Sequence, residues 1–291
     1  GLLFHLSSNF RSRTNRCFVI ASWRVQNAAN LALIRSCDQQ KLVPLFSEVI
    51  YSIARHDYSV QWQSLLQKIA TNLKCSENYS TIYGSLIALK ALVSIYSSLM
   101  LEEKAGLFNI VAVTFPCLQQ LTQKLFHNFN DQTAVVLLLV LKIFSTSTFG
   151  DLPPNLKASD SLHLWFIFFK KIMDFEAGPT PSEQLLKLKH RASKIVYRFV
   201  QHHANPKYDK AYAEFFLGRY AVAFLESFVL ILVSPLTGTW KSKMDKLAML
   251  SFPYLYKWRP CQERLDVHRT AIVPIVMQRS KLTNKDLETW V

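Results

Sequence analysis

Glycine is scarce in this chain of 291 residues: there are seven, and no two lie closer than twenty positions apart. A phosphate-binding loop needs clustered glycines, because its backbone must turn tightly and approach the anion closely. The spacing therefore excludes a Walker loop, a dinucleotide-binding fingerprint and a nucleophile elbow.

Cysteine is also sparse and shows no pattern. The five cysteines are Cys17, Cys37, Cys75, Cys117 and Cys261. Their number is odd, their spacing is wide and no C-x-x-C occurs, so the sequence supports no zinc ribbon, redox motif or disulfide framework. We expect reduced thiols in a cytosolic or nuclear compartment.

Long hydrophobic runs are missing as well. The longest, Ala134–Leu141, is far shorter than the ~20 apolar residues that cross a bilayer. The apolar segment Tyr220–Leu236 is longer, but Arg219, Glu226 and Pro235 indicate a core helix there. No charged region precedes the apolar first residues, so a signal peptide is not predicted. We expect no membrane insertion.

What the chain has is apolar bulk and positive charge. Half of its residues are hydrophobic and 19% are charged, a composition too apolar for disorder and sufficient for a large core. Lys and Arg number 34 against 20 Asp and Glu, a net charge of +14. This balance favours acidic partners, which include nucleic acid, anionic lipid and acidic protein surfaces.

Apolar residues recur with helical spacing along most of the chain. Trp62, Leu65, Leu66, Ile69 and Leu73 follow i, i+3, i+4, i+7, i+11, which is one face of an α-helix. No segment alternates with period two, so the fold is predicted to be all-α. Helix-capping residues, such as Asp131, and helix-breaking Gly and Pro residues predict these helices: 44–55, 60–74, 79–100, 104–129, 131–148, 159–174, 183–203, 208–233, 240–257, 261–279 and 284–291.

Taken two at a time, these helices start a new pair roughly every 35–55 residues, which is the period of HEAT-like repeats. In such repeats each hairpin buries its apolar face by stacking on its neighbours. We therefore predict an α-α superhelix, a HEAT/ARM-like solenoid of antiparallel helix pairs. A compact helical bundle is the alternative.

Few residues suggest chemistry. His202 and His203 have no carboxylate or cysteine at ligand spacing, so a helix C-terminal cap is favoured over a metal site. His56 and Asp57 lie in a predicted corner between two helices, where a salt-bridged turn is favoured over catalysis. No catalytic, metal or cofactor-binding residue is predicted, and we expect a protein that is not an enzyme.

One charge pattern is better organised. Lys187, Arg191, Lys194 and Arg198 are spaced i, i+4, i+7, i+11 on the face of a predicted helix opposite its apolar stripe. This basic ridge is either a solvated face or a contact surface for an acidic protein or a phosphate backbone. No aromatic residue interleaves it, which weakens the nucleic-acid interpretation. We expect all four side chains to be solvent-accessible.

Four segments carry a further pattern. They are Glu48–Trp62, with His56, Asp57 and Trp62; Leu141–Phe144 followed by Leu152-Pro153 and Trp165; Leu188–Phe199 followed by Tyr212-Ala213-Glu214-Phe215; and Ile272–Ile275 followed by Leu282–Trp290. In order and spacing they resemble nuclear transport receptors of the importin-β (karyopherin-β) superfamily, specifically the importin-seven and importin-eight branch. Ser59 stands where the first pattern usually has proline.

The resemblance implies HEAT-like repeats over residues 34–291, preceded by a divergent segment over residues 1–33. It implies a non-enzymatic receptor that binds cargo protein, the GTPase Ran and Phe-Gly nucleoporins, and that works in cytoplasm, nucleus and nuclear pore. Trp62 is expected to pack between two helices, and Asp57 to be tied to local backbone or a cation.

Two departures accompany the resemblance. Gly1–Asn30 does not match the family's first repeats, where Ran chiefly docks, and this chain is basic whereas family members are usually acidic. The chain is expected to be an N-terminal-side fragment of a longer receptor or a shortened member. An exportin of the same superfamily, and a HEAT-type scaffold that binds acidic protein or RNA, are the alternatives. A protein partner is favoured over nucleic acid.

Overall fold

The computed structural model describes residues 48, 50–52, 64–75, 77–97, 104–157, 161–176, 178, 181–207 and 209–287. Every regular element in these ranges is helical and none is a strand, so the predicted all-α class is confirmed. The chain divides into two compact units, Gly1–Cys117 and Leu118–Val291. The predicted boundary at residues 33 and 34 lies outside the described residues.

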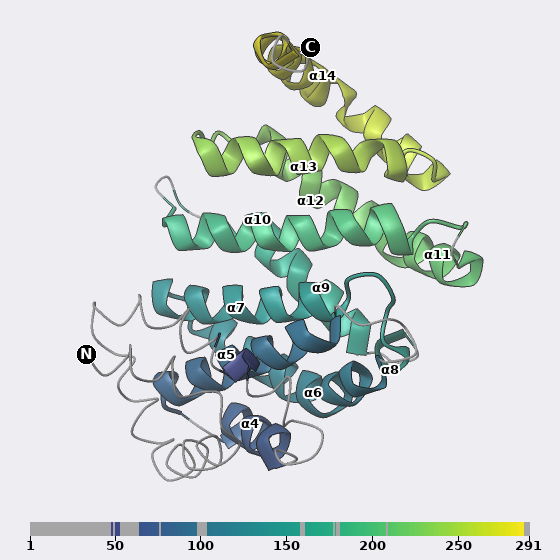
Figure 1. Cartoon of the computed structure of the whole chain (residues 1–291). Coiled ribbons are helices and arrows are strands. Elements are labelled where there is room, and N and C mark those ends of the chain that lie inside the picture. The colour runs from purple at the N-terminus through teal and green to yellow at the C-terminus, as the bar shows by residue number, and fades with distance from the viewer. Residues whose placement is uncertain are drawn as a thin grey trace. The chain divides into compact units, whose positions relative to one another are not determined.

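The named elements are shown in Figure 1. They are α4 (Ser64–Cys75), α5 (Tyr79–Ser97), α6 (Ala105–His127), α7 (Asp131–Ser147), α8 (Pro154–Lys157), α9 (Ser161–Asp174), α10 (Glu183–Arg198), η4 (Phe199–His203), α11 (Lys210–Phe216), η5 (Leu217–Ala221), α12 (Val222–Val233), α13 (Thr239–Leu255) and α14 (Arg259–Leu287). The elements η4 and η5 are single π-helical turns.

In the first unit, α4 packs against α5, which is apolar on nearly every side. Asn72 of α4 donates a hydrogen bond from Nδ2 to Ser85 Oγ of α5 at 3.1 Å. Gly106, near the start of α6, lies against the ring of Tyr96. A Cβ at Gly106 would overlap with Cε1 of that ring, so a larger residue would force the ring aside.

In the second unit, α10 is central. It packs against α7 and α13 in one row of helices, which lie side by side in Figure 1, while α12 packs against α9 and α14 in the other row. Further contacts of α10 with α9, and of α13 with α12 and α14, join the two rows. Helices consecutive in sequence therefore fall into alternate rows, and the predicted stack of packed helix pairs is confirmed.

The core of this unit is aromatic. Its members come from α7, α9, η4, α11 and α12: Phe144, Trp165, Phe166, Phe169, Phe199, Phe216 and Phe224. Phe166 lies edge-on to Phe216 with ring centres 5.2 Å apart, and Phe144 lies 4.8 Å from Trp165. Such tilted and edge-to-face pairs add attraction beyond the burial of their apolar area.

Several predicted boundaries are corrected. Asn130, not Asp131, caps α7: its side chain accepts from the backbone N–H of Thr133, and Thr133 Oγ1 accepts in return from the backbone N–H of Asn130. The predicted helix 208–233 is divided by the π turn η5. The break predicted between residues 279 and 284 is absent, because α14 continues from Arg259 to Leu287. The four-residue helix α8 was not predicted.

Three described helices are long and apolar enough, by length and composition, to cross a membrane: Tyr79–Ser97, Ala105–His127 and Lys210–Val233. Of these, only the last overlaps an apolar segment singled out from the sequence, Tyr220–Leu236, which is expected to be a core helix. Within the protein, 61%, 44% and 56% of their most apolar windows, respectively, are buried. A helix that packs against neighbours on several sides needs apolar residues on all of those sides, so its composition can match that of a membrane-spanning helix.

An ion pair is buried in the second unit. Lys241 of α13 places Nζ 2.5 Å from Asp245 Oδ1 and 3.2 Å from the carbonyl oxygen of Leu232 in α12, to which it donates. Both charged side chains are 2% exposed. Removing one partner of such a pair leaves a buried charge without compensation, which costs far more than the pair itself contributes.

We predict that Lys241→Met lowers the free energy of unfolding by about 3–5 kcal/mol, because Asp245 keeps a desolvated carboxylate that has lost its cation. The double variant Lys241→Met/Asp245→Leu should recover most of that loss, since neither buried charge remains. Urea titration of the three proteins measures both effects. A double variant less stable than Lys241→Met would contradict the expectation.

Candidate functional site

The basic ridge lies on α10, as the sequence predicts. Ser182 caps the helix, its side-chain oxygen accepting from the backbone N–H of Leu185 at 3.2 Å. The apolar stripe is buried in the core: Leu185, Leu188, Ala192, Ile195 and Val196. The opposite face carries Lys187, Arg191, Lys194 and Arg198.

The four ridge side chains are neither fully exposed nor fully buried. All four are half-buried, and the side chain of Lys187 is 29% exposed. The cause is the packing of α7 and α13 along the two flanks of α10. This packing covers the long aliphatic stems of the cations.

At the N-terminal end of α10, the ridge meets a tryptophan of α13. The ammonium of Lys187 lies 3.1 Å from Glu183 Oε1 and 5.9 Å from the ring centre of Trp240. Trp240 also has Lys243 Nζ 4.3 Å from its ring centre and the imidazole of His190 at 5.4 Å. Hydrogen bonds from Lys187 and from the Trp240 indole lower the pKa of the Glu183 carboxyl.

At the C-terminal end of α10, the ridge meets the end of α7. Arg198 donates a hydrogen bond to Ser145 Oγ at 3.1 Å, and its guanidinium carbon lies 5.5 Å from the ring centre of Phe149. Phe149 is itself 63% exposed. This contact fixes the guanidinium beside an accessible aromatic ring, an arrangement stabilised by cation–π attraction.

Between these two ends, at the centre of the ridge, lie Arg191 and Lys194. Neither forms an ion pair with any residue that the structure describes. Burial, and then the neighbouring positive charges, lower the pKa of both side chains, with Arg198 acting on both and Arg191 on Lys194. An incoming carboxylate or phosphate would relieve this repulsion.

We name Lys187, Arg191, Lys194, Arg198 and Lys243 the basic surface. The fifth cation and the aromatic neighbours were missed by sequence reasoning, which searched for aromatic residues within one helix. They come from other elements: Phe149 follows α7, whereas Trp240 and Lys243 belong to α13. No spacing rule within α10 could have found them, because the packing of three helices brings them together.

The remaining predicted residues give no second site. His56, Asp57 and Trp62 lie outside the described residues, and their roles stay predictions. His203 ends the π turn η4, 3.4 Å from the carbonyl oxygen of Thr148, and burial lowers its pKa to about 4, so it is neutral at pH 7. Within the described ranges no group of three His, Cys, Asp or Glu side chains could hold a metal ion.

The pKa of His190 responds to the positive charges of the basic surface as well as to burial. Burial first, and then Lys194, Arg191 and Lys243, lower its pKa from 6.5 to about 4. The unfolded chain therefore binds a proton on this imidazole at a higher pH than the folded chain does. The folded state loses stability through His190 as the pH falls from 6.5 towards 4, and is unaffected by it above 6.5.

We predict that Lys243→Gln raises the pKa of His190, because one of the positive charges that oppose protonation is removed. Titration of the imidazole proton resonances by NMR would measure this pKa in the wild type and the variant. Lys246→Gln is the matched control, because Lys246 is on the same helix, is also exposed and is not among the causes of the shift. An imidazole of His190 that titrates near 6.5 in the wild type would contradict the assignment.

Comparison with known proteins gives a partial match to one family. Mouse importin-8 is 28% identical over 193 residues, which cover 62% of this chain and 19% of importin-8. The importin beta-like SAD2 homolog of Arabidopsis thaliana is 27% identical over 62% of this chain and 18% of its own length. In Saccharomyces cerevisiae, nonsense-mediated mRNA decay protein 5 is 24% identical over 65% of this chain and 20% of its own length.

The matched segment is about a fifth of the length of these relatives. No protein-family model matches the chain, and no solved structure does. The several importin-8 and importin beta-like relatives agree with the all-α stack of helix pairs and with the segments that resemble this family. These relatives, 26–28% identical over about 62% of the chain, support membership of the importin-β superfamily as a partial match.

Proposed function

We propose that this chain is part of a nuclear transport receptor and that its basic surface on α10 and α13 binds an acidic segment of a protein partner. At the level of the family, the relatives support a nuclear transport receptor or a HEAT-like scaffold. Cargo protein, Ran and Phe-Gly nucleoporins are the partners that the relationship suggests, with activity in nucleus and cytoplasm and at the nuclear pore. The relatives named importins are transport receptors and not enzymes, and we extend this to the chain.

The observation that carries the proposal is the pair Arg191 and Lys194. Both are half-buried cations, and neither has a carboxylate partner in the described part of the chain. Lys187 at one end of the surface is paired with Glu183, but the neighbour Arg198 is a further cation, so positive charge is concentrated around Arg191 and Lys194. Such a cluster attracts an acidic ligand, raises the rate of encounter and fixes how the partner docks.

A protein partner fits this surface better than RNA does. Single-stranded RNA binds by stacking its bases on accessible aromatic faces between cations. Here the Trp240 ring already has Lys187, Lys243 and His190 against it. The exposed ring of Phe149 has the Arg198 guanidinium against it in the same way, so both rings of the surface already hold cations. Carboxylates need only the cations, so an acidic peptide uses the surface as it stands.

We predict that the double charge reversal Arg191→Glu/Lys194→Glu weakens binding of a fluorescein-labelled Glu-rich peptide roughly tenfold at low ionic strength, since each exposed ion pair contributes up to ~1 kcal/mol. The dependence of affinity on salt should also become flatter. Fluorescence anisotropy at two ionic strengths measures both.

Lys171→Glu/Lys207→Glu is the matched control, because it makes the same change of charge at exposed positions away from α10. It should keep most of the peptide affinity. Equal losses in the two double variants would mean that net charge, and not this surface, binds the peptide. A steep salt dependence with labelled oligouridylate RNA, and none with the peptide, would favour the scaffold that binds RNA.

The transport role has its own test. We expect the chain, or a longer protein that contains it, to retain GTP-locked Ran in a pull-down more strongly than GDP-bound Ran, because a transport receptor releases or gains cargo in response to the GTP form. Phe-Gly repeat peptides on beads test the second partner. Binding neither GTP-locked Ran nor Phe-Gly repeats would leave a helical scaffold without a transport role.

A further inference from the structure

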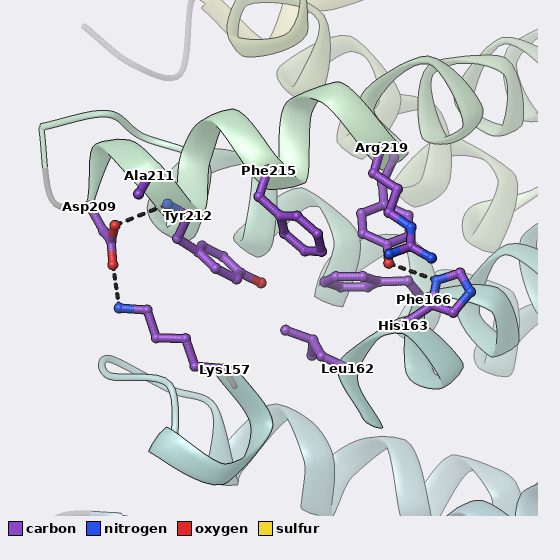
Figure 2. A pocket seen from close by; sticks show the side chains of 10 residues that line it. Lys157, Leu162, His163, Phe166, Asp209, Ala211, Tyr212, Phe215 and Arg219 are labelled. Carbon is purple, nitrogen blue, oxygen red and sulfur yellow. Dashed lines mark hydrogen bonds and ion pairs between the residues drawn. The ribbon is translucent and has the colours of Figure 1, made fainter. Parts of the chain in front are cut away.

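A second candidate site lies in the other part of this unit, away from α10. A cavity of about 470 Å³ opens between α8 and α9 on one side and α11 and η5 on the other. Its volume falls within the range of ~300–1,000 Å³ of small-molecule sites. Figure 2 shows the side chains that line it, with those of α11 facing those of α8 and α9.

The floor of the cavity is apolar and aromatic. Leu162 and Phe166 of α9 are 3% and 1% exposed, and Tyr220 of η5 is 7% exposed. The rings of Phe166 and Tyr220 lie 4.8 Å apart and tilted, and Phe215 of α11, which is 49% exposed, lies 6.1 Å from Tyr220. These rings suit a flat apolar ligand that is half enclosed and enters past Phe215.

One polar group in the cavity has no partner among the residues that the structure describes. Tyr212 is 7% exposed, and its hydroxyl makes no hydrogen bond with any residue that the structure describes. In Figure 2 this hydroxyl points away from α11 into the cavity. Burial raises the pKa of Tyr212, so the hydroxyl keeps its proton and is able to donate. A buried donor without an acceptor is costly, and a ligand oxygen would satisfy it.

The charged side chains at the rim of the cavity favour an anionic ligand. The guanidinium carbon of Arg219 lies 5.8 Å from the ring centre of Phe215 and 5.7 Å from that of Tyr220, and among the described residues Arg219 has no carboxylate partner. The one carboxylate of the lining, Asp209, is already occupied. It accepts from Lys157 Nζ and from the backbone N–H of Tyr212 at 3.0 Å. The cavity therefore has a free cation and no free anion.

From these observations we propose that the cavity binds a small aromatic anion, a flat ring system that carries a carboxylate or sulfonate. The ring lies on Phe166, Phe215 and Tyr220, Arg219 neutralises the anionic group, and the Tyr212 hydroxyl donates a hydrogen bond to a ligand oxygen. Tyr212 and Phe215 belong to the Tyr-Ala-Glu-Phe segment of the sequence analysis. This proposal is independent of the basic surface and of a transport role.

Anilinonaphthalene sulfonate is a suitable probe, because it is a fluorescent aromatic anion, and phenylnaphthylamine is its neutral counterpart. We expect one molecule of the sulfonate per chain, bound more tightly than the amine. Tyr212→Phe removes only the hydroxyl oxygen, and it should weaken sulfonate binding about tenfold while the melting temperature stays the same or rises. Arg219→Gln should weaken the sulfonate but not the amine.

Two further variants keep the test specific to this cavity. Ala211→Trp fills the opening from an exposed position and should abolish binding of both probes. Arg269→Gln, at an exposed position of α14, makes the same change of charge as Arg219→Gln and should bind the probes like the wild type. Unchanged sulfonate affinity in Tyr212→Phe or Ala211→Trp would overturn the proposed site. Equal binding of the amine and the sulfonate, with no effect of Arg219→Gln, would overturn the anionic class.

Discussion

The burial of α10 is the constraint on which the second unit depends. An isolated helix cannot cover its own apolar stripe, and in α10 the side chains of Leu188, Ala192 and Val196 are fully buried. That burial requires helices along both flanks, which α7 and α13 supply. The same flanks then cover the stems of the cations on the opposite face. The core and the basic surface are therefore two results of one packing arrangement.

This coupling explains why the cations are held in fixed positions. Arg198 is anchored at Ser145 and Phe149, and Lys187 at Glu183 and Trp240. A partner that binds such a surface loses less side-chain entropy than one that must order freely moving lysines. It also explains the lowered pKa of His190, since the burial that creates the core brings an imidazole among the cations.

Features that depend only on the spacing and composition of residues could be predicted from the sequence. The scarcity of glycine, the helical spacing of apolar residues and the opposite faces of α10 all follow from the order of residues within one helix. The predictions that needed correction concern features that are set by contacts between neighbouring helices or by the geometry of a single turn. Phe149 and Trp240 lie far from Arg191 in the chain and reach the ridge only through packing, so a search within α10 could not find them. Asn130 was missed as a cap because Asp131, beside it, is an equally good candidate.

The cavity was likewise beyond sequence reasoning. Tyr212 and Phe215 were noticed as part of a family-like segment, but nothing in that segment indicates that the tyrosine hydroxyl lacks a partner. Lys157 comes from the four-residue helix α8, which is too short to show a period. The cavity uses side chains of α8, α9, α11 and η5, whereas the basic surface uses those of α10 and α13.

The π turn η5 has a consequence for how this chain tolerates changes of length. A π turn holds one residue more than the α turn it replaces, and Arg219 and Tyr220 both lie within it. A single-residue deletion elsewhere in the helix would rotate everything beyond it by about 100° and expose the core. Within Leu217–Ala221, the same deletion would restore regular α-helix and leave α11 and α12 in phase with their neighbours. A shortened homologue could thus keep the fold while losing the guanidinium at the cavity rim.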